Sequence, residues 1–428
     1  MPSPGPERAE SSRQVGDHVA WAMAIGGMIG GGVYTLAGVI LGLAGPLAWL
    51  SLVLGCLVAL ATANSYARLA LTTCGDAVPI SVYSGVGQRG AASVLAWGLL
   101  LVYVLSLAVY TFTVGHYFGR ALGFSPGLIA VFEIGVVGIL VALNARRIEH
   151  PAVVQVIAVW IELAVLGALA VVGFLRWDPE NLTRGVPGPS VAGVLVAMAT
   201  TFIAFEGFEM LVYDVKDVRR PRRVLRVEVP RAVITVGFAY AIVTMGAASL
   251  VGADVLVRYQ ENSLAIAGAA AAGTTGLVVV TIAACASAIS AINATLFSVA
   301  RLARTTAQRG LLPVPFARSN VHGAPVLALL VIGAVALVVA ISSSLEPLVA
   351  AASLGFLALF LLVNVLALQR LTHGRWIAMG GAVGAGGAAL IVVARLVTEH
   401  PFSLAILALL VAIGGLTHVA MRRARHVA

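Results

Sequence analysis

The chain has 428 residues, of which 60% are hydrophobic and 11% are charged, and its mean hydropathy is +1.00. A soluble domain of this length does not need so much apolar surface, so the composition excludes most soluble enzymes and binding modules and indicates an integral membrane protein. A net charge of +9 could indicate a nucleic-acid-binding protein, but the positions of the basic residues indicate membrane topology instead. No nucleic-acid partner is therefore expected.

Residues 1–17 are polar and lack the apolar core and cleavage pattern of a signal peptide, which predicts a cytosolic N-terminal tail. Residues 18–420 predict one all-α transmembrane domain, because runs of about 20 apolar residues can cross the hydrocarbon core of a bilayer. A cytosolic tail over 421–428 follows. About twelve spans are expected, at 18–42, 46–66, 93–118, 127–146, 152–175, 190–213, 231–252, 273–300, 324–343, 347–368, 376–397 and 401–420.

The charges between the spans predict the orientation. If the N-terminus is cytosolic, the inside segments carry 22 of the 27 Lys and Arg residues. Such an excess is the positive-inside signature, and it places both termini in the cytosol. The expected location is the cytoplasmic membrane, which the chain crosses many times.

The first span is interrupted by glycine. Five of the seven residues from Gly26 to Gly32 are glycine, more than close helix packing requires. Unwound backbone is tolerated at membrane depth only where protein or a water-filled cavity satisfies its polar groups. Amides at the start of the following half-helix would suit a carboxylate. The alternative is a plain helix–helix contact, since Gly26/Gly30 and Gly27/Gly31 have small-xxx-small spacing.

The sixth span is interrupted by the sequence Phe205-Glu206-Gly207-Phe208-Glu209. Carbonyls that end its first half-helix could hold a cation such as an ammonium group. Glu206 and Glu209 are ionisable groups at membrane depth, where such groups are rare and usually functional. Pairing with backbone amides at the break is the structural alternative for each.

The two breaks predict an internal inverted repeat. Five spans separate them, so repeat one (about 18–175) and repeat two (about 190–368) have opposite orientations, with accessory helices over 376–420. Corresponding breaks in two inverted halves are typical of a secondary transporter. On the third span Tyr103, Ser106, Tyr110 and Thr113 form a stripe that either lines a cavity or makes interhelical hydrogen bonds.

These features resemble the amino acid–polyamine–organocation transporters. Members carry a Gly-Ser-Gly-Ile/Val-Phe type motif in span 1, where this chain has Gly30-Gly31-Gly32-Val33-Tyr34. They carry Phe-Ala-Tyr/Phe-x-Gly-Phe-Glu/Asp in span 6, which matches 203–209, and segments similar to 214–223 and 293–313 follow in the same order. The resemblance runs from about residue 18 to 370 and implies a LeuT-like 5+5 inverted repeat with broken helices 1 and 6.

The resemblance also implies roles for particular residues. Amides of Gly30, Gly31 and Gly32 would hold a substrate carboxylate. The amine would lie against carbonyls of Met28, Ile203 and Glu206, beside Gly207, with Phe205 near the side-chain pocket and Glu209 at a position tied to gating.

Span 5 departs from several proton-coupled relatives, in which a lysine stands where this chain has Glu162. We hypothesise that Glu162 binds a cation with help from Ser287 and Ser290 of span 8, or that it gains and loses a proton itself. The alternative is that Glu162 only pairs with a neighbouring hydroxyl or backbone group.

The sequence therefore predicts a secondary active transporter that moves an amino acid by alternating access, coupled to H⁺ or Na⁺ or working by exchange. It contains no ATP-binding, catalytic or metal-ligand motif, so neither an enzyme nor a resident cofactor or metal is expected. Two alternatives remain open: a carrier of polyamines or other organic amines, and a non-transporting solute sensor. The sequence predicts no oligomeric state.

Overall fold

The computed structural model describes residues 15–30, 32–73, 78–85, 87–146, 152–213, 218–401 and 408. Most of the predicted tail 1–17, the whole tail 421–428, Gly31 and nearly all of the predicted span 401–420 therefore lie outside the described residues. Within the described ranges the regular structure is helical, apart from an isolated bridge between Val15 and Val218.

The helices follow the predicted spans in chain order. The first half contains α1 (Asp17–Ile29), α2 (Gly32–Ala44), α3 (Ala48–Thr73), α4 (Val78–Gly85), α5 (Arg89–Ala121), α6 (Pro126–Ala145) and α7 (Ala152–Leu175). The second half contains α8 (Val191–Thr200), α9 (Phe208–Tyr213), α10 (Pro221–Arg223), α11 (Val229–Val251), α12 (Ala253–Arg258), α13 (Ser263–Gln308), α14 (Val326–Ser342), α15 (Leu345–Arg370) and α16 (Arg375–Glu399).

Among the described residues, eight helical stretches are long and apolar enough to cross a bilayer. The pair formed by α8 and residues 202–213, bent by 62°, would make a ninth, and α14 is apolar but shorter. The all-α membrane fold is confirmed. The count of twelve stays a prediction, because the last predicted span is almost entirely outside the described residues.

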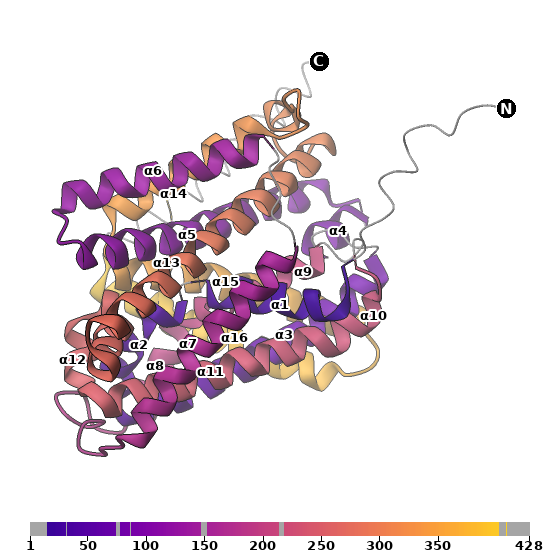
Figure 1. Cartoon of the computed structure of the whole chain (residues 1–428). Coiled ribbons are helices and arrows are strands. Elements are labelled where there is room, and N and C mark those ends of the chain that lie inside the picture. The colour runs from indigo at the N-terminus through magenta and orange to yellow at the C-terminus, as the bar shows by residue number, and fades with distance from the viewer. Residues whose placement is uncertain are drawn as a thin grey trace.

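Both predicted breaks are present. The first separates α1 from α2, and the second separates α8 from α9. In Figure 1 the path from α1 to α2 runs from right to left, whereas the path from α8 to α9 runs from left to right. The two broken spans are therefore antiparallel, as expected of inverted halves.

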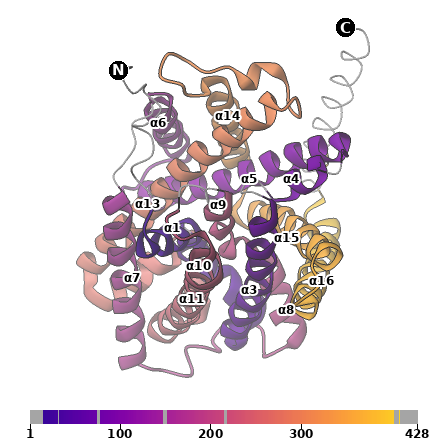
Figure 2. The ribbon, with the colours of Figure 1, turned by 90° about the vertical axis from the view of Figure 1, so that its right-hand side faces the viewer.

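The broken helices lie in the interior of the bundle. α1 contacts α7, α9, α11 and α13, so its break is enclosed by helices from both halves. In Figure 2, α15 and α16 lie together on one flank and α7 on the other. Outward faces carry exposed apolar side chains, such as Val131 on α6 (63% exposed) and Leu390 on α16 (73%). Lipid is the solvent in which such faces are stable.

An arm that was not predicted from the sequence lies between the seventh and eighth spans. It consists of α12, a 3₁₀ turn over Gln260–Asn262 and the start of α13, up to a kink at Ala272 and Gly273. The arm packs on α2 so closely that a Cβ on Gly38 would lie 2.3 Å from the Leu256 carbonyl oxygen. A hydrogen bond from Arg184 (2.9 Å) fastens the arm at Asp254 and lowers the pKa of that carboxyl.

Candidate functional site: the junction of two broken helices

The first break is built on a left-handed glycine. α1 ends at Ile29, and Gly30 has φ 30° and ψ 11°, a region that residues with a Cβ rarely adopt. A Cβ on Gly30 would lie 2.9 Å from Cβ of Ala291 and 3.0 Å from the Tyr110 ring. Glycine at position 30 therefore lets α5 and α13 approach the break directly.

The second break differs from the prediction in its local structure. We expected 203–207 to end a half-helix with free carbonyls, but the α-helix ends at Thr200 and a 3₁₀ turn covers Phe202–Phe205. The Ile203 carbonyl accepts a hydrogen bond from the Glu206 amide (3.0 Å), so it is only partly available. Only Glu206 and Gly207, which has φ 107°, separate this turn from α9.

The second break crosses the last turn of α1, just before the first break, at a pair of glycines. A Cβ on Gly207 would lie 2.5 Å from the carbonyl carbon of Gly27, closer than real Cβ contacts allow. At the start of α2, a Cβ on Gly32 would lie 3.5 Å from Cα of Ala204 in the 3₁₀ turn. The broken spans thus cross backbone against backbone, which places the ends of four half-helices at one point inside the bundle.

Polar atoms collect at this junction. The Tyr110 hydroxyl donates a hydrogen bond to Glu206 Oε1, and the Tyr240 hydroxyl donates one to the Met28 carbonyl (2.9 Å). Glu206 is fully buried and its carboxyl faces the Ser106 hydroxyl, but Oε2 meets hydrogen-bond geometry with no described group. Because Tyr110 also lies against Gly30, the Glu206 carboxyl is held near the first break. An unsatisfied buried oxygen is costly, so this atom is a natural contact for a solute.

Glu209 has a local structural role. Its Oε2 accepts a hydrogen bond from the Gly207 amide (2.9 Å), and its Oε1 accepts one from the Tyr103 hydroxyl (3.3 Å). A carboxylate in the first turn of α9 satisfies a free amide and interacts favourably with the helix dipole. The structure therefore provides the backbone pairing that we gave as the alternative, and a gating role stays a prediction.

The stripe on the third span divides into two kinds of contact. Tyr103 and Tyr110 reach the second break through their hydroxyls, whereas Ser106 and Thr113 bond to carbonyls of their own helix. Interhelical hydrogen bonding thus explains the two tyrosines.

We expect Tyr110→Phe to weaken solute binding. The change removes the hydrogen bond that positions the Glu206 carboxyl. Loss of such a buried bond typically costs about 1–3 kcal/mol, so the KM of uptake should rise by roughly tenfold or more. Tyr117→Phe is the matched control, because its hydroxyl lies in the same helix but donates to the Tyr34 carbonyl. Equal KM values for both variants would contradict the assignment.

Phe205 packs away from the polar atoms of the junction. Its ring fills a notch between α3 and α11, where a Cβ on Gly55 would lie 2.7 Å from the ring. Its centroid is 5.9 Å from that of Tyr240. Contact between Phe205 and a solute side chain stays a prediction.

Glu162 lies beside α13 and has an incomplete set of partners. The residue is 6% exposed, and its carboxyl faces the Ser287 hydroxyl. Neither Glu162 Oε1 nor Ser287 Oγ meets hydrogen-bond geometry with any described group, and the buried Tyr34 hydroxyl likewise has no described partner. These oxygens, on α2, α7 and α13, are buried and have no partner among the described groups.

Ser290 does not join this group. Its hydroxyl donates to Gln155 Oε1 (3.0 Å), and Gln155 lies so close to α1 that a Cβ on Gly26 would be 2.2 Å from its Nε2. The predicted pair of serines is therefore divided, with Ser287 at Glu162 and Ser290 at Gln155. Gln155 was not predicted, since a single amide in an apolar span has no recognisable pattern.

The end of α8 is anchored by two residues that the sequence analysis also missed. The Ser353 hydroxyl donates to the Thr200 carbonyl (2.7 Å) and accepts from the Ile203 amide (3.0 Å). Arg395 of α16 donates to Thr200 Oγ1 (3.1 Å). The two Ser353 bonds satisfy backbone groups that the break releases from the helix, and Arg395 holds the Thr200 side chain.

Removing the Ser353 hydroxyl should destabilise the second break. Ser353→Ala leaves the buried Ile203 amide without its acceptor, at a typical cost of about 1–3 kcal/mol. We expect a lower melting temperature for the purified protein and slower uptake. Ser342→Ala serves as the control, because that exposed hydroxyl bonds only within its own helix. The anchoring role would be wrong if both variants had the same melting temperature as the unaltered protein.

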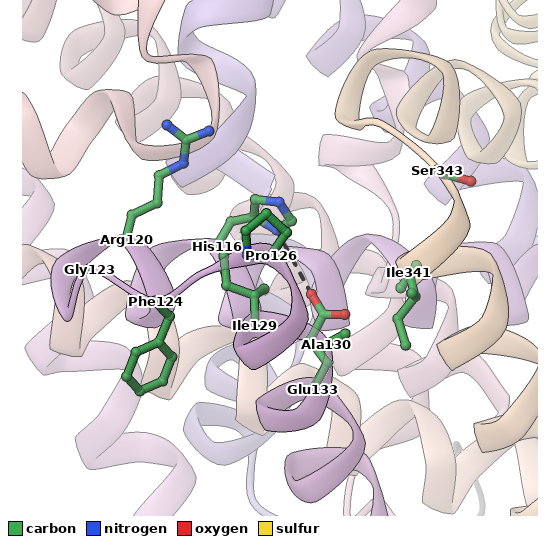
Figure 3. A pocket seen from close by; sticks show the side chains of 11 residues that line it. His116, Arg120, Gly123, Phe124, Pro126, Ile129, Ala130, Glu133, Ile341 and Ser343 are labelled. Carbon is green, nitrogen blue, oxygen red and sulfur yellow. Dashed lines mark ion pairs between the residues drawn. The ribbon is translucent and has the colours of Figure 1, made fainter.

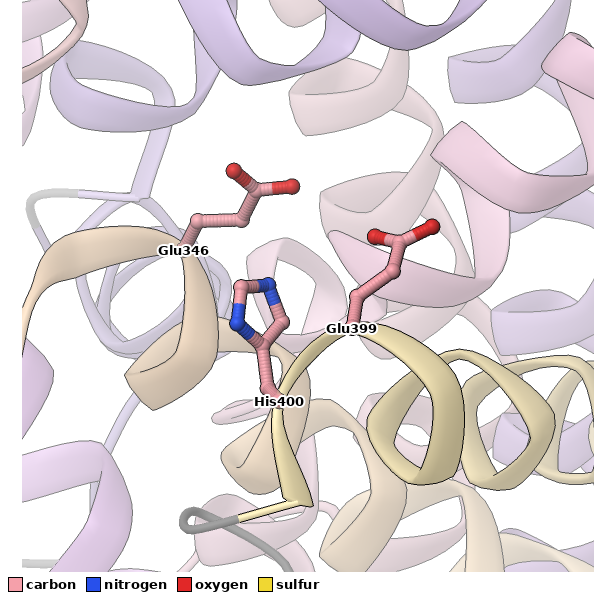
Figure 4. Close-up of side chains that lie close together, drawn as sticks. All are labelled: Glu346, Glu399 and His400. Atoms are coloured by element: carbon pink, nitrogen blue, oxygen red, sulfur yellow. The ribbon is translucent and has the colours of Figure 1, made fainter.

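A second polar cluster lies where α15 begins and α16 ends. Glu346, Glu399 and His400 bring potential metal-ligand atoms within 4.8 Å of one another (Figure 4). Arg395 forms ion pairs with both carboxylates. Because this guanidinium already supplies the positive charge, we interpret the cluster as an ion-pair network that positions Arg395 on Thr200.

The start of α1 is tied to the segment that follows α9. Asp17 pairs with Arg223 (3.2 Å), and the Arg219 amide donates to the Val15 carbonyl (3.0 Å). The rings of His18, Trp21 and Trp160 of α7 form a cluster in which each ring contacts the other two. These contacts join the start of α1 to the segment that follows α9 on the predicted cytosolic side.

Fold and junction together define a multi-pass membrane transporter with two broken helices. The chain belongs to the amino acid permease family, whose model matches residues 19–412, within the amino acid–polyamine–organocation superfamily. Inner membrane transport protein YbaT of Escherichia coli is 28% identical over 360 residues, which are 82% of each chain. The methylthioribose transporter of Bacillus subtilis is 26% identical over 48% of each chain.

The fold is shared with solved transporters. The structure of MhsT in complex with L-phenylalanine has a TM-score of 0.61 at 15% identity, and the match covers 90% of this chain and 98% of that one. At this identity the similarity shows the fold alone.

Proposed function

We propose that this protein is a secondary active permease of the cytoplasmic membrane that carries an amino acid by alternating access. The observation that carries the proposal is the contact of Gly207, in the second break, with Gly27, in the last turn of α1 just before the first break. Unwound segments at membrane depth are the usual solute sites of such transporters. With both tails cytosolic, rocking of one set of helices around this junction would open it to each side in turn.

The proposed solute lies between the two breaks. Amides at the start of α2, from Gly30 to Gly32, would hold a carboxylate at a positive helix end. The Met28 carbonyl and the Glu206 carboxyl would face the ammonium group. Because Tyr240 and the Glu206 amide already engage the Met28 and Ile203 carbonyls, the free Glu206 Oε2 is the strongest acceptor in the set.

Glu162 is the proposed coupling residue. A buried carboxyl facing an unpartnered serine hydroxyl can take up either a proton or a small cation such as Na⁺. Its position on α7, which packs against α1 and α13, links it to the first break. Taking up the ion would neutralise the carboxylate and so favour one arrangement of these helices over the other.

The second candidate is a carrier of polyamines or other organic amines without a carboxylate. The specific observation in its favour is the burial of two carboxyl groups, Glu206 and Glu209, at the junction. A relative named for methylthioribose shows that similar chains carry names for solutes other than amino acids. A non-transporting sensor remains the third candidate, since fold alone does not determine function.

Counterflow in proteoliposomes tests these candidates. Vesicles preloaded with unlabelled amino acids would receive a labelled amino acid mixture, and a putrescine pair would run alongside. We expect accumulation of amino acids alone. Putrescine flux without amino acid flux would favour the amine carrier, and binding without flux of either would favour the sensor.

A further inference from the structure

A cavity lies between α5, α6 and α14, and its lining includes none of the junction residues. Its volume is about 560 Å³, and its lining includes Phe124, Ile129 and Ile341. The cavity is reached from the loop that joins α5 to α6, on the predicted outer side of the membrane. Its polar lining residues are His116, Arg120, Glu133 and Ser343.

Glu133 is buried in the wall of this cavity. Only 2% of the residue is exposed, and Oε1 has no hydrogen-bond partner in the described parts of the chain. The carboxyl rests in a notch on α5, where a Cβ on Gly115 would lie 2.1 Å from Oε1. Figure 3 shows the carboxyl directed toward the ring of His116, with 3.8 Å between Glu133 Oε1 and His116 Nδ1.

His116 is positioned as a hydrogen-bond acceptor. Its ring stacks on Phe112 with centroids 3.7 Å apart, and Nδ1 lies 3.0 Å from the Phe112 carbonyl oxygen. A carbonyl oxygen only accepts hydrogen bonds, so Nδ1 carries the proton of the neutral ring. The other nitrogen, Nε2, is then an acceptor.

The guanidinium in the cavity lining pairs with another carboxylate rather than with Glu133. Arg120 lines the cavity but is half-exposed and forms an ion pair with Glu261 of the outer arm, with 2.5 Å between Nη2 and Oε2. The described lining thus offers a carboxylate and an imidazole acceptor, with its guanidinium engaged elsewhere. Burial of a carboxylate without a cationic partner is expensive.

We propose that this cavity binds a primary ammonium group, with Glu133 as its counter-ion and His116 as a second acceptor. The group would come from a soluble amine or from the headgroup of an aminophospholipid. The flank of α6 carries exposed Leu128 and Val131, so both water and lipid border the site. This proposal does not depend on what the central junction transports.

Thermal unfolding of the full-length protein in nanodiscs tests the proposal. One arm compares phosphatidylethanolamine with phosphatidylcholine, whose methylated amine has no N–H to donate. The other arm adds ethanolamine to phosphatidylcholine discs. Binding to the folded state alone should raise the melting temperature by about 2 °C or more. Glu133→Gln should abolish this rise, whereas Glu180→Gln, on a described outer segment away from the cavity, should keep it.

The two arms separate the sources. A rise with phosphatidylethanolamine supports the lipid headgroup, and a rise with ethanolamine supports a soluble amine. No rise in either arm, or an equal rise in Glu133→Gln, would overturn the proposal. His116→Phe provides a second variant, which should reduce the rise without introducing or removing a carboxyl group. If the melting temperature of this variant rose as much as that of the unaltered protein, His116 would have no part in the site.

Discussion

Gly207→Ala is expected to abolish transport. The residue has φ 107°, and its added Cβ would lie 2.5 Å from the Gly27 carbonyl carbon. Backbone strain of this kind costs of order 1–3 kcal/mol even before the overlap is counted, so counterflow should fall below about a tenth of normal. The overlap involves backbone on both sides, which leaves no side chain that can move away.

The control for this variant is Gly98→Ala. Gly98 is an exposed glycine within α5, and nothing lies within 4 Å of the Cβ that it would gain. We expect this variant to transport normally, since alanine favours a helix over glycine. Normal counterflow in Gly207→Ala would show that the close crossing of the two breaks is not needed for transport.

Glu162→Gln is expected to separate exchange from coupled uptake. Glutamine keeps the size of the side chain but neither titrates nor carries charge, so it cannot carry a proton or balance a cation. Uptake driven by an H⁺ or Na⁺ gradient should fall by about tenfold or more if Glu162 is the coupling element that we propose, since ionisable groups at membrane depth are usually functional. Counterflow, which needs no ion gradient, should continue.

The same variant supplies its own control. Retained counterflow shows that the protein is folded and that the solute site is intact. Comparison of pH and Na⁺ dependence before and after the change then identifies the coupling ion. Unchanged dependence on both ions in Glu162→Gln would remove Glu162 from the coupling mechanism.

Much of the fold could be predicted because lipid imposes strong constraints on sequence. Apolar runs of about 20 residues located the helices, and glycine at 26–32 and 207 located the breaks. The arm around α12 was missed because it is short and continues into the apolar run of α13. A periodicity argument cannot distinguish such an arm from the start of a span.

The contacts within the site could be predicted less well. The direct pairing of Gly27 with Gly207 joins residues 180 positions apart, and no local pattern specifies it. Ser353 and Tyr240 are single polar residues in apolar helices, and their partners are backbone groups that any sequence would provide. The Glu209 carboxyl caps α9, which was the structural alternative; its gating role stays a prediction, because a carboxylate after a glycine break fits both roles.

The central claim is that the solute binds between the two breaks. A structure determined with a bound amino acid that has passed the counterflow test would examine it most directly. We predict solute density bounded by Gly30 on one side and Glu206 on the other, with its ammonium group near Glu206 Oε2. Density elsewhere, with the space between the breaks closed, would contradict the account.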